Sequence, residues 1–341
     1  MSDLKGSVKL AGIRGLHASG VAPWVAPALG VRGVILTFHE IHDDLDSELR
    51  TGCPTPSFAK LIFWLRDAGW DIVTLDEALS RLHDRAHTRR FAVITFDDGY
   101  RDNIARALPI LRRAQAPFTT YIPTGAITRD LFAWWLGVRE LFRINDRVEI
   151  PFLDRTFFCS DLQGKRAALS AVMRWAHADL TRVSDLSYVF AKYRISLASL
   201  CDRYFINENE LRSLASDRLA TIGGHTATHP ALATLSETDV SREIEDNRAF
   251  LQDHLNREIN HLAYPYGCSR ACGQREARLA CEAGFRTAVT TSHRPLFTRD
   301  GFNPCALPRI NIHAHSTIAH LNTETSGITR ETVRYFLSAQ A

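Results

Sequence analysis

The sequence predicts an α/β fold in which parallel strands and helices alternate and close into a barrel. Three observations support this fold class. Short apolar runs alternate with amphipathic runs along most of the 341 residues, which is the pattern of repeated βα units. The run 91–96 is almost wholly apolar, as expected for a strand that is covered on both faces. About seven or eight such units can be recognised, enough to close a parallel barrel.

The first part of the chain supplies four strands of this barrel. The predicted strands cover residues 33–39, 71–75, 91–96 and 117–122. Thr55 is expected to cap the first helix, with Pro56 in its first turn and Gly69 at its end, because these residue types favour those positions. A second helix is predicted over residues 104–113 from its apolar periodicity.

Residues 125 to 215 interrupt this alternation and predict a largely helical insertion. Trp134 and Trp135 lie in an apolar helical segment, and residues 148–158 alternate in the manner of a hairpin. Polar helical stretches follow to Ser216. Because no linker rich in Pro, Gly and Ser bounds the segment, we expect an insertion and not an independent domain.

The alternation then resumes and completes the barrel. Further strands are predicted over residues 219–223, 260–264, 286–290 and 307–312. A helix begins at Ser236, carries Glu237 in its first turn and runs to about residue 255. We therefore expect one domain over residues 33–341, preceded by an N-terminal extension over residues 1–32.

Composition and charge exclude several classes of protein. Hydrophobic residues make up 45% and charged residues 23% of the chain, which is typical of a folded globular protein. The net charge is only +3, from 41 basic and 38 acidic residues, so no nucleic-acid partner is expected. No apolar run reaches the length of a membrane-spanning helix, so no transmembrane segment is expected.

The N-terminal extension contains an apolar stretch that does not match a secretory signal. Residues 20–31 follow three basic residues, but Pro23 and Pro27 interrupt them and no small-residue cleavage site follows. We expect a cytoplasmic location, with the periplasm or the cell exterior as the alternative.

The cysteine pattern leads to a related expectation. The chain has seven cysteines, an odd number, and none of them forms a Cys-x-x-Cys pair. In a chain of this size that pattern suits free buried thiols in a reducing compartment.

The first motif with chemical content is Thr-Phe-Asp-Asp-Gly at residues 95–99. Asp97 and Asp98 end an apolar strand, and side chains at that position reach the catalytic face of a βα-barrel. Two carboxylates so close together are costly unless a cation neutralises them. The alternative is a helix cap followed by a surface acid, since Asp is common in turns.

The second motif is His225-Thr-Ala-Thr-His229, which also follows a predicted strand. Two histidines at positions i and i+4 of a helical turn project to one side and can hold one metal ion. With 14 histidines in the chain, a chance pair is the alternative. Two imidazoles and one carboxylate from the first motif would make a three-ligand site with an open position for water, which is the composition of a hydrolytic zinc site.

The third motif, Ala263-Tyr-Pro-Tyr266-Gly267, ends another predicted strand. Pro and Gly favour a rigid loop, and its backbone N–H groups could hold a developing oxyanion. A simple turn is the alternative. Four aromatic residues are also candidates for ligand contacts, although at least one of the adjacent tryptophans is expected to be core; they are Trp134, Trp135, Tyr264 and Tyr266.

These three motifs, in this order, resemble the polysaccharide deacetylase family with the NodB homology domain, also known as carbohydrate esterase family 4. The match to T-F-D-D-G is complete at residues 95–99, and the match to H-[ST]-x-x-H is complete at residues 225–229. The third motif matches in Pro-Tyr-Gly at residues 265–267. The resemblance covers roughly residues 33 to 312 and is interrupted by the insertion.

The resemblance implies a distorted (β/α)7 barrel and a set of functional residues. Asp98, His225 and His229 would bind one divalent metal ion; zinc is expected, with cobalt or nickel as alternatives. Asp97 would be the general base, and the backbone N–H of Tyr266 would help stabilise the oxyanion. The implied reaction is removal of an acetyl group from an N-acetylated carbohydrate. This chemistry agrees with what the residues themselves suggest. With a carbohydrate as substrate, the four aromatic candidates could stack on sugar rings.

The sequence departs from the family pattern at two positions of the expected site. Many members carry an arginine just before the proline of the third motif, which this chain lacks. Arg309, at the end of a later strand, could take that role by pairing with Asp97. No Leu-x-His motif closes the chain to supply the general acid. Some permuted members supply this histidine from the first strand, so we expect His39 to be the acid; His313 is a late alternative.

Other functions use the same scaffold. An O-acetyl carbohydrate esterase or a sugar deformylase would use the same metal site, and the motifs do not separate them from an N-deacetylase. A non-catalytic carbohydrate-binding protein is disfavoured, because metal binding alone would not require Asp97. The sequence leaves the sugar and the oligomeric state open.

Overall fold

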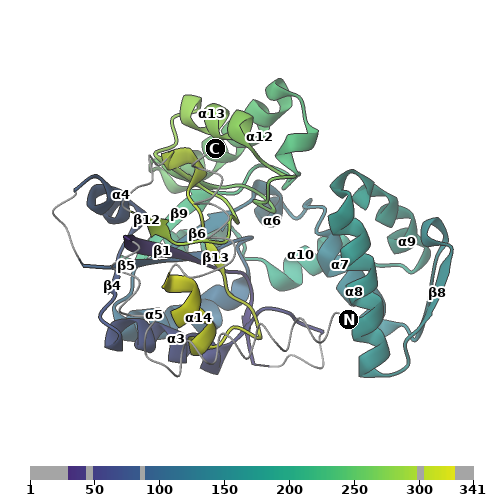
Figure 1. Ribbon diagram of the computed structural model, residues 1–341. Helices are drawn as coiled ribbons and strands as arrows, with labels where there is room; N and C mark the ends of the chain where they lie inside the picture. The colour runs from purple at the N-terminus through teal and green to yellow at the C-terminus, as the bar shows by residue number, and fades with distance from the viewer. Residues whose placement is uncertain (1–29, 44–48, 85–88, 298–302, 327–341) are drawn as a thin grey trace, which may run out of the picture.

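The structure is a computed structural model, and it describes residues 30–43, 49–84, 89–297 and 303–326. Six strands pair in parallel in the order β11-β10-β9-β6-β5-β1 (Figure 1). They are β1 (Val31–Phe38), β5 (Phe91–Phe96), β6 (Phe118–Ile122), β9 (Ala220–Gly224), β10 (His261–Ala263) and β11 (Thr287–Val289).

The segment 307–312 joins the two edges of this curled sheet. The N–H of Leu307 donates to the carbonyl of Ala288 at 2.9 Å, and its own carbonyl accepts from Thr290 at 2.8 Å. Three residues later, β13 (Ile310–Asn311) pairs in parallel with β1. The seventh strand is therefore short and irregular, and the predicted distorted (β/α)7 barrel is confirmed.

The strand pattern follows from burial on both faces. All six residues of β5 are fully buried. Ala92, Ile94 and Phe96 face the outer core under the helices, whereas Phe91 and Val93 belong to the core inside the barrel. This two-sided burial explains why the strand is an apolar run without alternation.

Helices surround the barrel (Figure 1). They are α3 (Thr55–Asp67), α4 (Leu75–His83), α5 (Leu108–Ala114), α6 (Thr124–Thr128), α11 (Glu208–Ala215), α12 (Glu237–Leu255), α13 (Gln274–Glu282) and α14 (Ile318–Thr325). Short elements complete the fold: β2 (Ile41–His42), β3 (Cys53–Pro54), β4 (Asp71–Ile72), β12 (Leu296–Phe297), η1 (Asn103–Ala107), η4 (Leu232–Thr234) and η5 (Pro304–Ala306). Ser236 caps α12 by accepting from the N–H of Asp239, as expected of a serine at that position.

Two expected helix details are wrong. Thr55 is the first residue of α3 and not its cap, because Pro54 occupies the cap position. The predicted helix over 104–113 begins with a π-helical turn, η1, before α5 starts at Leu108. A π-turn widens the helix by one residue and is frequent near functional sites; this one directly follows the Asp-Asp motif.

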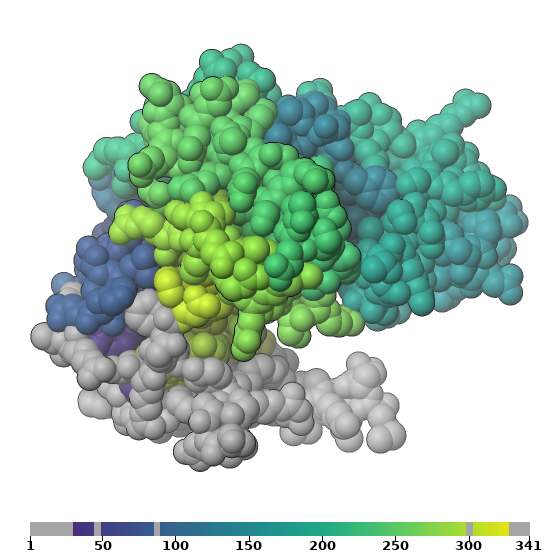
Figure 2. All heavy atoms as spheres, turned by 90° about the horizontal axis from the view of Figure 1, so that it is seen from above, coloured from purple at the N-terminus to yellow at the C-terminus, as the bar shows by residue number. Residues whose placement is uncertain are grey.

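The insertion forms a lobe beside the barrel with a hydrophobic core of its own (Figures 1 and 2). Its elements are α7 (Trp134–Ile144), β7 (Arg147–Ile150), η2 (Pro151–Leu153), β8 (Arg155–Phe158), α8 (Leu162–Ala178), η3 (Leu180–Asp185), α9 (Leu186–Lys192) and α10 (Leu197–Tyr204). The antiparallel pair β7–β8 is the predicted hairpin. The boundaries at about 125 and 215, and the single domain over 33–341, stay predictions.

The cysteines correct one expectation. Cys281 on α13 and Cys305 in η5 form a disulfide, whereas free thiols were expected throughout. The helix and the irregular strand segment bring the two sulfurs together across 24 residues of sequence, a pairing that residue spacing does not reveal. The five remaining cysteines are free thiols.

Two other expectations concern the N-terminus and membranes. Residues 1–29 of the predicted extension, with nearly all of the apolar stretch 20–31, lie outside the described residues, and Val31 and Arg32 already belong to β1. Among the described residues, no helix has the length and apolar character needed to cross a bilayer.

Candidate metal centre and active site

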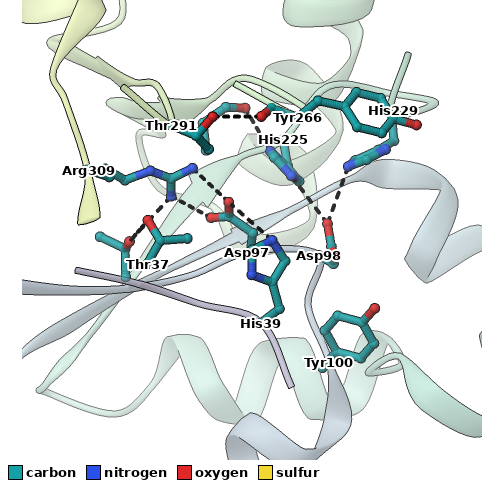
Figure 3. Close-up of polar contacts among 12 residues, drawn as sticks. Thr37, His39, Asp97, Asp98, Tyr100, His225, His229, Tyr266, Thr291 and Arg309 are labelled. Carbon is teal, nitrogen blue, oxygen red and sulfur yellow. Dashed lines mark hydrogen bonds and ion pairs between the residues drawn. The ribbon is translucent and has the colours of Figure 1, made fainter. Parts of the chain in front are cut away.

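The two adjacent aspartates lie at the carboxyl end of β5 and face different partners. Figure 3 shows the carboxylate of Asp97 directed toward Arg309 and that of Asp98 directed toward His225 and His229. Both side chains are buried, with 2% and 5% of their residue surface exposed. The divergence arises because Asp98 adopts a positive φ of 71°, which turns the chain between the two carboxylates. The sequence predicted the pair but not this separation of their surroundings.

Asp97 forms a bidentate ion pair with Arg309. Nη1 and Nη2 of Arg309 donate to the two carboxylate oxygens, each at 2.7 Å. Arg309 is 1% exposed, and its Nε donates to the carbonyl of Thr290 at 3.0 Å. A buried planar guanidinium held at all three nitrogens fixes the carboxylate in one orientation. The predicted contact between residues 212 positions apart is therefore present in the structure.

Asp98, His225 and His229 converge to form the candidate metal centre. Nε2 of each histidine lies 3.3 Å from Oδ1 of Asp98. One nitrogen or oxygen atom from each residue lies within 4.8 Å of the others. One carboxylate oxygen and two imidazole nitrogens are ligands that suit zinc and similar divalent ions. The three predicted ligands are thus brought together by β5 and β9.

The expectation of a helical turn at the two histidines is wrong. Residues 225–231 form an irregular loop after β9, and Thr226 and His229 have positive φ values of 66° and 63°, which an α-helix does not contain. The side chains converge because the loop folds back on itself. Tyr266 also has a positive φ, 61°. Strained backbone therefore occurs in all three motif loops, as is common at functional sites.

A hydrogen bond outside the candidate metal centre orients the ring of His225. Its Nδ1 lies 2.7 Å from the carbonyl of Ala263, which can only accept, so Nδ1 carries the proton and Nε2 is free to bind a metal. Burial alone would lower the pKa of the His225 ring, but its contacts with Asp98 and Asp97 raise it above the ordinary value. Negative charge around this imidazole therefore favours a cation in the site.

The two candidate acids differ electrostatically. Burial alone would raise the pKa of the Asp97 carboxyl, but the charge of Arg309 lowers it below the ordinary value. Burial also opposes ionisation of Asp98, whose contacts with His225 and His229 hold its pKa well below the ordinary range. Because Arg309 balances Asp97, the Asp98 carboxylate is left to balance a bound cation. This charge distribution fits a divalent metal at Asp98 and a separate base at Asp97.

Helix α12 holds the histidine loop in place, a role that the sequence did not reveal. Asn247 is fully buried; its Oδ1 accepts from the N–H of His225 at 2.9 Å, and its Nδ2 donates to the carbonyl of Ile122 at 3.0 Å. One turn earlier, Glu243 accepts from the N–H and the hydroxyl of Thr228 at 2.8 and 2.6 Å. The i and i+4 spacing places both side chains on one helix face, which is the one available signal.

Tyr266 lies beside the candidate metal centre. Its ring centroid is 5.1 Å from that of His229, and its carbonyl accepts from the hydroxyl of Thr291 at 2.9 Å (Figure 3). The N–H of Tyr266 makes no hydrogen bond to another described residue. It is therefore available to a ligand, as the predicted oxyanion role requires.

Of the remaining predicted residues, His39 lies beside Asp97, whereas His313 and two of the aromatic residues have other surroundings. Nε2 of His39 lies 4.0 Å from Oδ2 of Asp97, and the His39 side chain is 40% exposed. His313 is exposed and contacts Ser316, so of the two candidate acids His39 is the one beside Asp97. Trp134 is buried, as expected for at least one of the tryptophans, and Tyr264 is core as well, with its hydroxyl bonded to the carbonyl of Cys305.

The fold and the site together define a (β/α)7-barrel protein with a carboxylate–bis-histidine centre at the carboxyl ends of its strands. A family model described as polysaccharide deacetylase matches residues 84–287, more than half of the chain. The chain therefore belongs to the polysaccharide deacetylase family.

A relative in Escherichia coli K12 bears the name poly-beta-1,6-N-acetyl-D-glucosamine N-deacetylase. It is 27% identical over 127 residues, which is 32% of this chain and 19% of that protein. This chain thus matches less than a fifth of that relative's length.

Solved structures share the fold at low sequence identity. The deacetylase PplD of Streptococcus pyogenes, determined in complex with acetate, is 16% identical with a TM-score of 0.58, covering 87% of this chain and 99% of that one. IcaB from Ammonifex degensii is 17% identical with a TM-score of 0.56, covering 87% and 98%. These two structures show that the barrel and most of the chain around it have the same architecture.

Proposed function

We propose that this protein is a metal-dependent hydrolase that removes the acetyl group from an N-acetylated sugar. One observation carries the proposal: an Arg309-held carboxylate, Asp97, lies next to the Asp98–His225–His229 cluster. A three-ligand centre alone would bind a metal, whereas a fixed, ionised carboxylate beside it adds a base. The names of the Escherichia coli relative and of PplD, an N-deacetylase and a deacetylase, support the same chemistry.

The proposed cofactor is one divalent ion held by Asp98, His225 and His229. Zinc is favoured by the two imidazole nitrogens and one carboxylate oxygen, with cobalt or nickel as alternatives. When bound, the ion supplies a Lewis acid and lowers the pKa of water at the site.

Asp97 takes the proton of the attacking water in this mechanism. Its two oxygens are occupied by Arg309 at 2.7 Å each, but a carboxylate oxygen has a second lone pair and can accept further. Arg309 keeps the carboxylate ionised at neutral pH, so the base is ready before substrate binds. The oxygen of the water then attacks the acetyl carbonyl carbon.

The N–H of Tyr266 donates to the oxyanion that develops on the carbonyl oxygen. His39, on the opposite side of Asp97 from Arg309 (Figure 3), gives a proton to the sugar nitrogen as the carbon–nitrogen bond breaks. Acetate and the free amine leave. The exposed position of His39 suits a group that must regain its proton from solvent between turnovers.

Acetate release tests this proposal. Purified protein is incubated with N-acetylated and O-acetylated sugars as monomers, oligomers and nucleotide-linked forms, before and after chelation and after restoring zinc or cobalt. We expect release from an N-acetylated member that stops on chelation and returns with metal. Release from O-acetylated members alone would replace the amidase with an esterase. Release from no member of a metal-loaded protein would contradict the proposed activity.

A further inference from the structure

Helix α7 of the insertion reaches the barrel loops that carry the candidate catalytic residues. Figure 1 shows α7 on the side of the lobe that faces the barrel. Three of its side chains, Trp134, Trp135 and Arg139, contact three separate loops. Trp135 and Arg139 are one helical turn apart and share a face of the helix, and Trp134 adjoins them.

The two indole groups bind the tyrosine that follows the first motif and a tyrosine of the third motif. Nε1 of Trp134 donates to the hydroxyl of Tyr266 at 2.9 Å. Nε1 of Trp135 donates to the hydroxyl of Tyr100 at 2.8 Å. The ring of Trp135 also lies 4.9 Å from the ring of His229, centroid to centroid. The first turn of α7 therefore contacts three residues of the candidate site region. They are Tyr266, the candidate oxyanion donor; Tyr100, which follows Gly99; and His229, a candidate metal ligand.

Arg139 reaches the third loop, beside His39. Its Nη1 donates to Oε2 of Glu40 at 2.6 Å, and both side chains are buried. Burying an ion pair is costly, and its net contribution to stability is small or negative. A buried pair that links two lobes at the residue next to the candidate acid therefore points to a positional role.

The far end of the insertion returns to the same place. The N–H of Ile206 donates to the carbonyl of Gly99 at 3.0 Å, and Phe205 forms an antiparallel bridge with Tyr100. Tyr100 is thus held through its side chain by α7 and through its backbone by the segment after α10. The two residues before Tyr100, Asp98 and Gly99, both have positive φ. A turn with this backbone conformation needs contacts from the surrounding structure to persist.

We infer that α7 is a positioning element of the active site, with Trp134, Trp135 and Arg139 as positioning residues for Tyr266, Tyr100 and His39. This inference rests on the proposed function for its catalytic consequence, but its structural content stands on the contacts alone. The insertion thereby belongs to the catalytic unit, because the three loops share one external support.

Two variants remove single contacts while keeping most of the packing. Trp134→Phe keeps a ring and deletes the donor to Tyr266, and Arg139→Gln deletes the charge that faces Glu40. We expect each to lower kcat by about tenfold or more, since small displacements of reacting groups cost rate steeply, with little change in KM. Exchange of the hydrogen-bonded amides should rise locally, at Gly267 and Thr291 in the first variant and at Ile41 in the second. Arg139→Lys, which keeps the charge, should recover much of the loss.

Matched controls lie in the same lobe. Trp175 on α8 stacks on Phe152 at 4.6 Å, and Arg143 pairs with Glu140 within α7. Trp175→Phe and Arg143→Gln change the same residue types away from the three loops, and they should leave both kcat and the local exchange unchanged. Equal losses of kcat in test and control variants, or unchanged local exchange in Trp134→Phe and Arg139→Gln, would overturn the inference.

The exchange measurement separates this inference from the proposed function. If the wild-type protein released no acetate, the proposed function would fail, and local exchange at the two loops that the variants probe would still decide whether α7 positions them. If the wild-type protein were active and the variants kept both kcat and local protection, only the positioning role would fail.

Discussion

At the residue scale, the proposed mechanism depends on how the buried carboxylate of Asp97 is kept ionised. Asp97 is buried, and burial raises a carboxyl pKa. Arg309 reverses this effect and lowers the pKa of Asp97, and the guanidinium itself is fully enclosed, with its Nε bonded to the carbonyl of Thr290. The proposed base and its partner therefore form one unit, and a change in Arg309 should appear in the protonation of Asp97.

Substituting Arg309 should move the pH dependence of the reaction. As the proposed base, Asp97 acts only when ionised, so we expect activity above the pKa of Asp97 and its loss as the pH falls through that pKa. Arg309→Met removes the charge that lowers this pKa. The apparent pKa of the acid limb of the kcat/KM profile should therefore rise by about one to three pH units. Arg309→Lys should shift it less, because a point charge remains.

The stability of these two variants has to be measured alongside. Leaving the Asp97 carboxylate buried without a partner costs on the order of 3–5 kcal/mol, so Arg309→Met must be assayed below its own Tm, and Arg309→Lys serves as the milder variant. An acid limb that stays in place in both folded variants would show that Asp97 is not the titrating base.

At the element scale, the candidate metal centre lies at the ends of two strands, and helix α12 supports the loop that carries its histidines. Asp97 and Asp98 directly follow β5, and the two histidines lie in the loop after β9. Helix α12 connects that loop to β6 through Asn247. The N–H of His225 and the carbonyl of Ile122 are buried groups that need partners, and a single side-chain amide satisfies both.

Removing this amide should weaken metal binding without removing a ligand. Asn247→Ala frees the backbone of His225, and loss of such a supporting contact typically lowers metal affinity by about 10–100-fold. Zinc or cobalt titration with a competing chelator measures this change. Asp246→Ala, at an exposed position of the same helix, serves as the control and should leave the affinity unchanged. Equal affinities in the two variants would show that α12 does not support the centre.

Much of the site could be predicted from the sequence, because the residues of the first two motifs directly follow apolar strands. The run 91–96 and the pairs Asp97–Asp98 and His225–His229 each carry a local signal, so their convergence followed from the barrel. The loop shape did not, because positive φ at Thr226 and His229 has no marker such as glycine. Asn247 was missed because its i and i+4 spacing with Glu243 is common on helices, and its role depends on tertiary contacts with the backbone of His225 and Ile122.

At the scale of the whole molecule, two cores are joined across the site. The barrel and the insertion each have a hydrophobic cluster, and the contacts of α7 connect them at the motif loops. The sequence indicated the insertion because the alternation of apolar and amphipathic runs is interrupted over residues 125 to 215. Its docking could not be predicted, since partners such as Arg139 and Glu40 are 99 residues apart.

The disulfide is a whole-molecule feature with a measurable effect. It joins α13 to the segment that closes the barrel across a sequence separation of 24, and a loop of that size is worth about 3.5 kcal/mol in the chain-entropy model. We expect reductant to lower Tm by several degrees and Cys305→Ser to show the same lower Tm with no further response to reductant. Cys159→Ser, at a free buried thiol, should keep the response.

Thiol titration of the unfolded, unreduced protein checks the pairing directly. Five reactive thiols are expected from the seven cysteines, and seven would contradict the disulfide. The cytoplasmic location stays a prediction, and a structural disulfide weighs against it because such bonds persist mainly in oxidising compartments.

The central claim is that metal binding and base catalysis reside in different residues of one site. Its most direct test is to measure bound metal per chain and acetate release together in Asp97→Asn and His225→Ala, using the substrate that the wild-type protein deacetylates. We predict that Asp97→Asn keeps one metal ion and loses turnover by at least about a hundredfold, whereas His225→Ala loses the metal and the activity together. Near-normal turnover in metal-loaded Asp97→Asn, or full metal content in His225→Ala, would contradict this account.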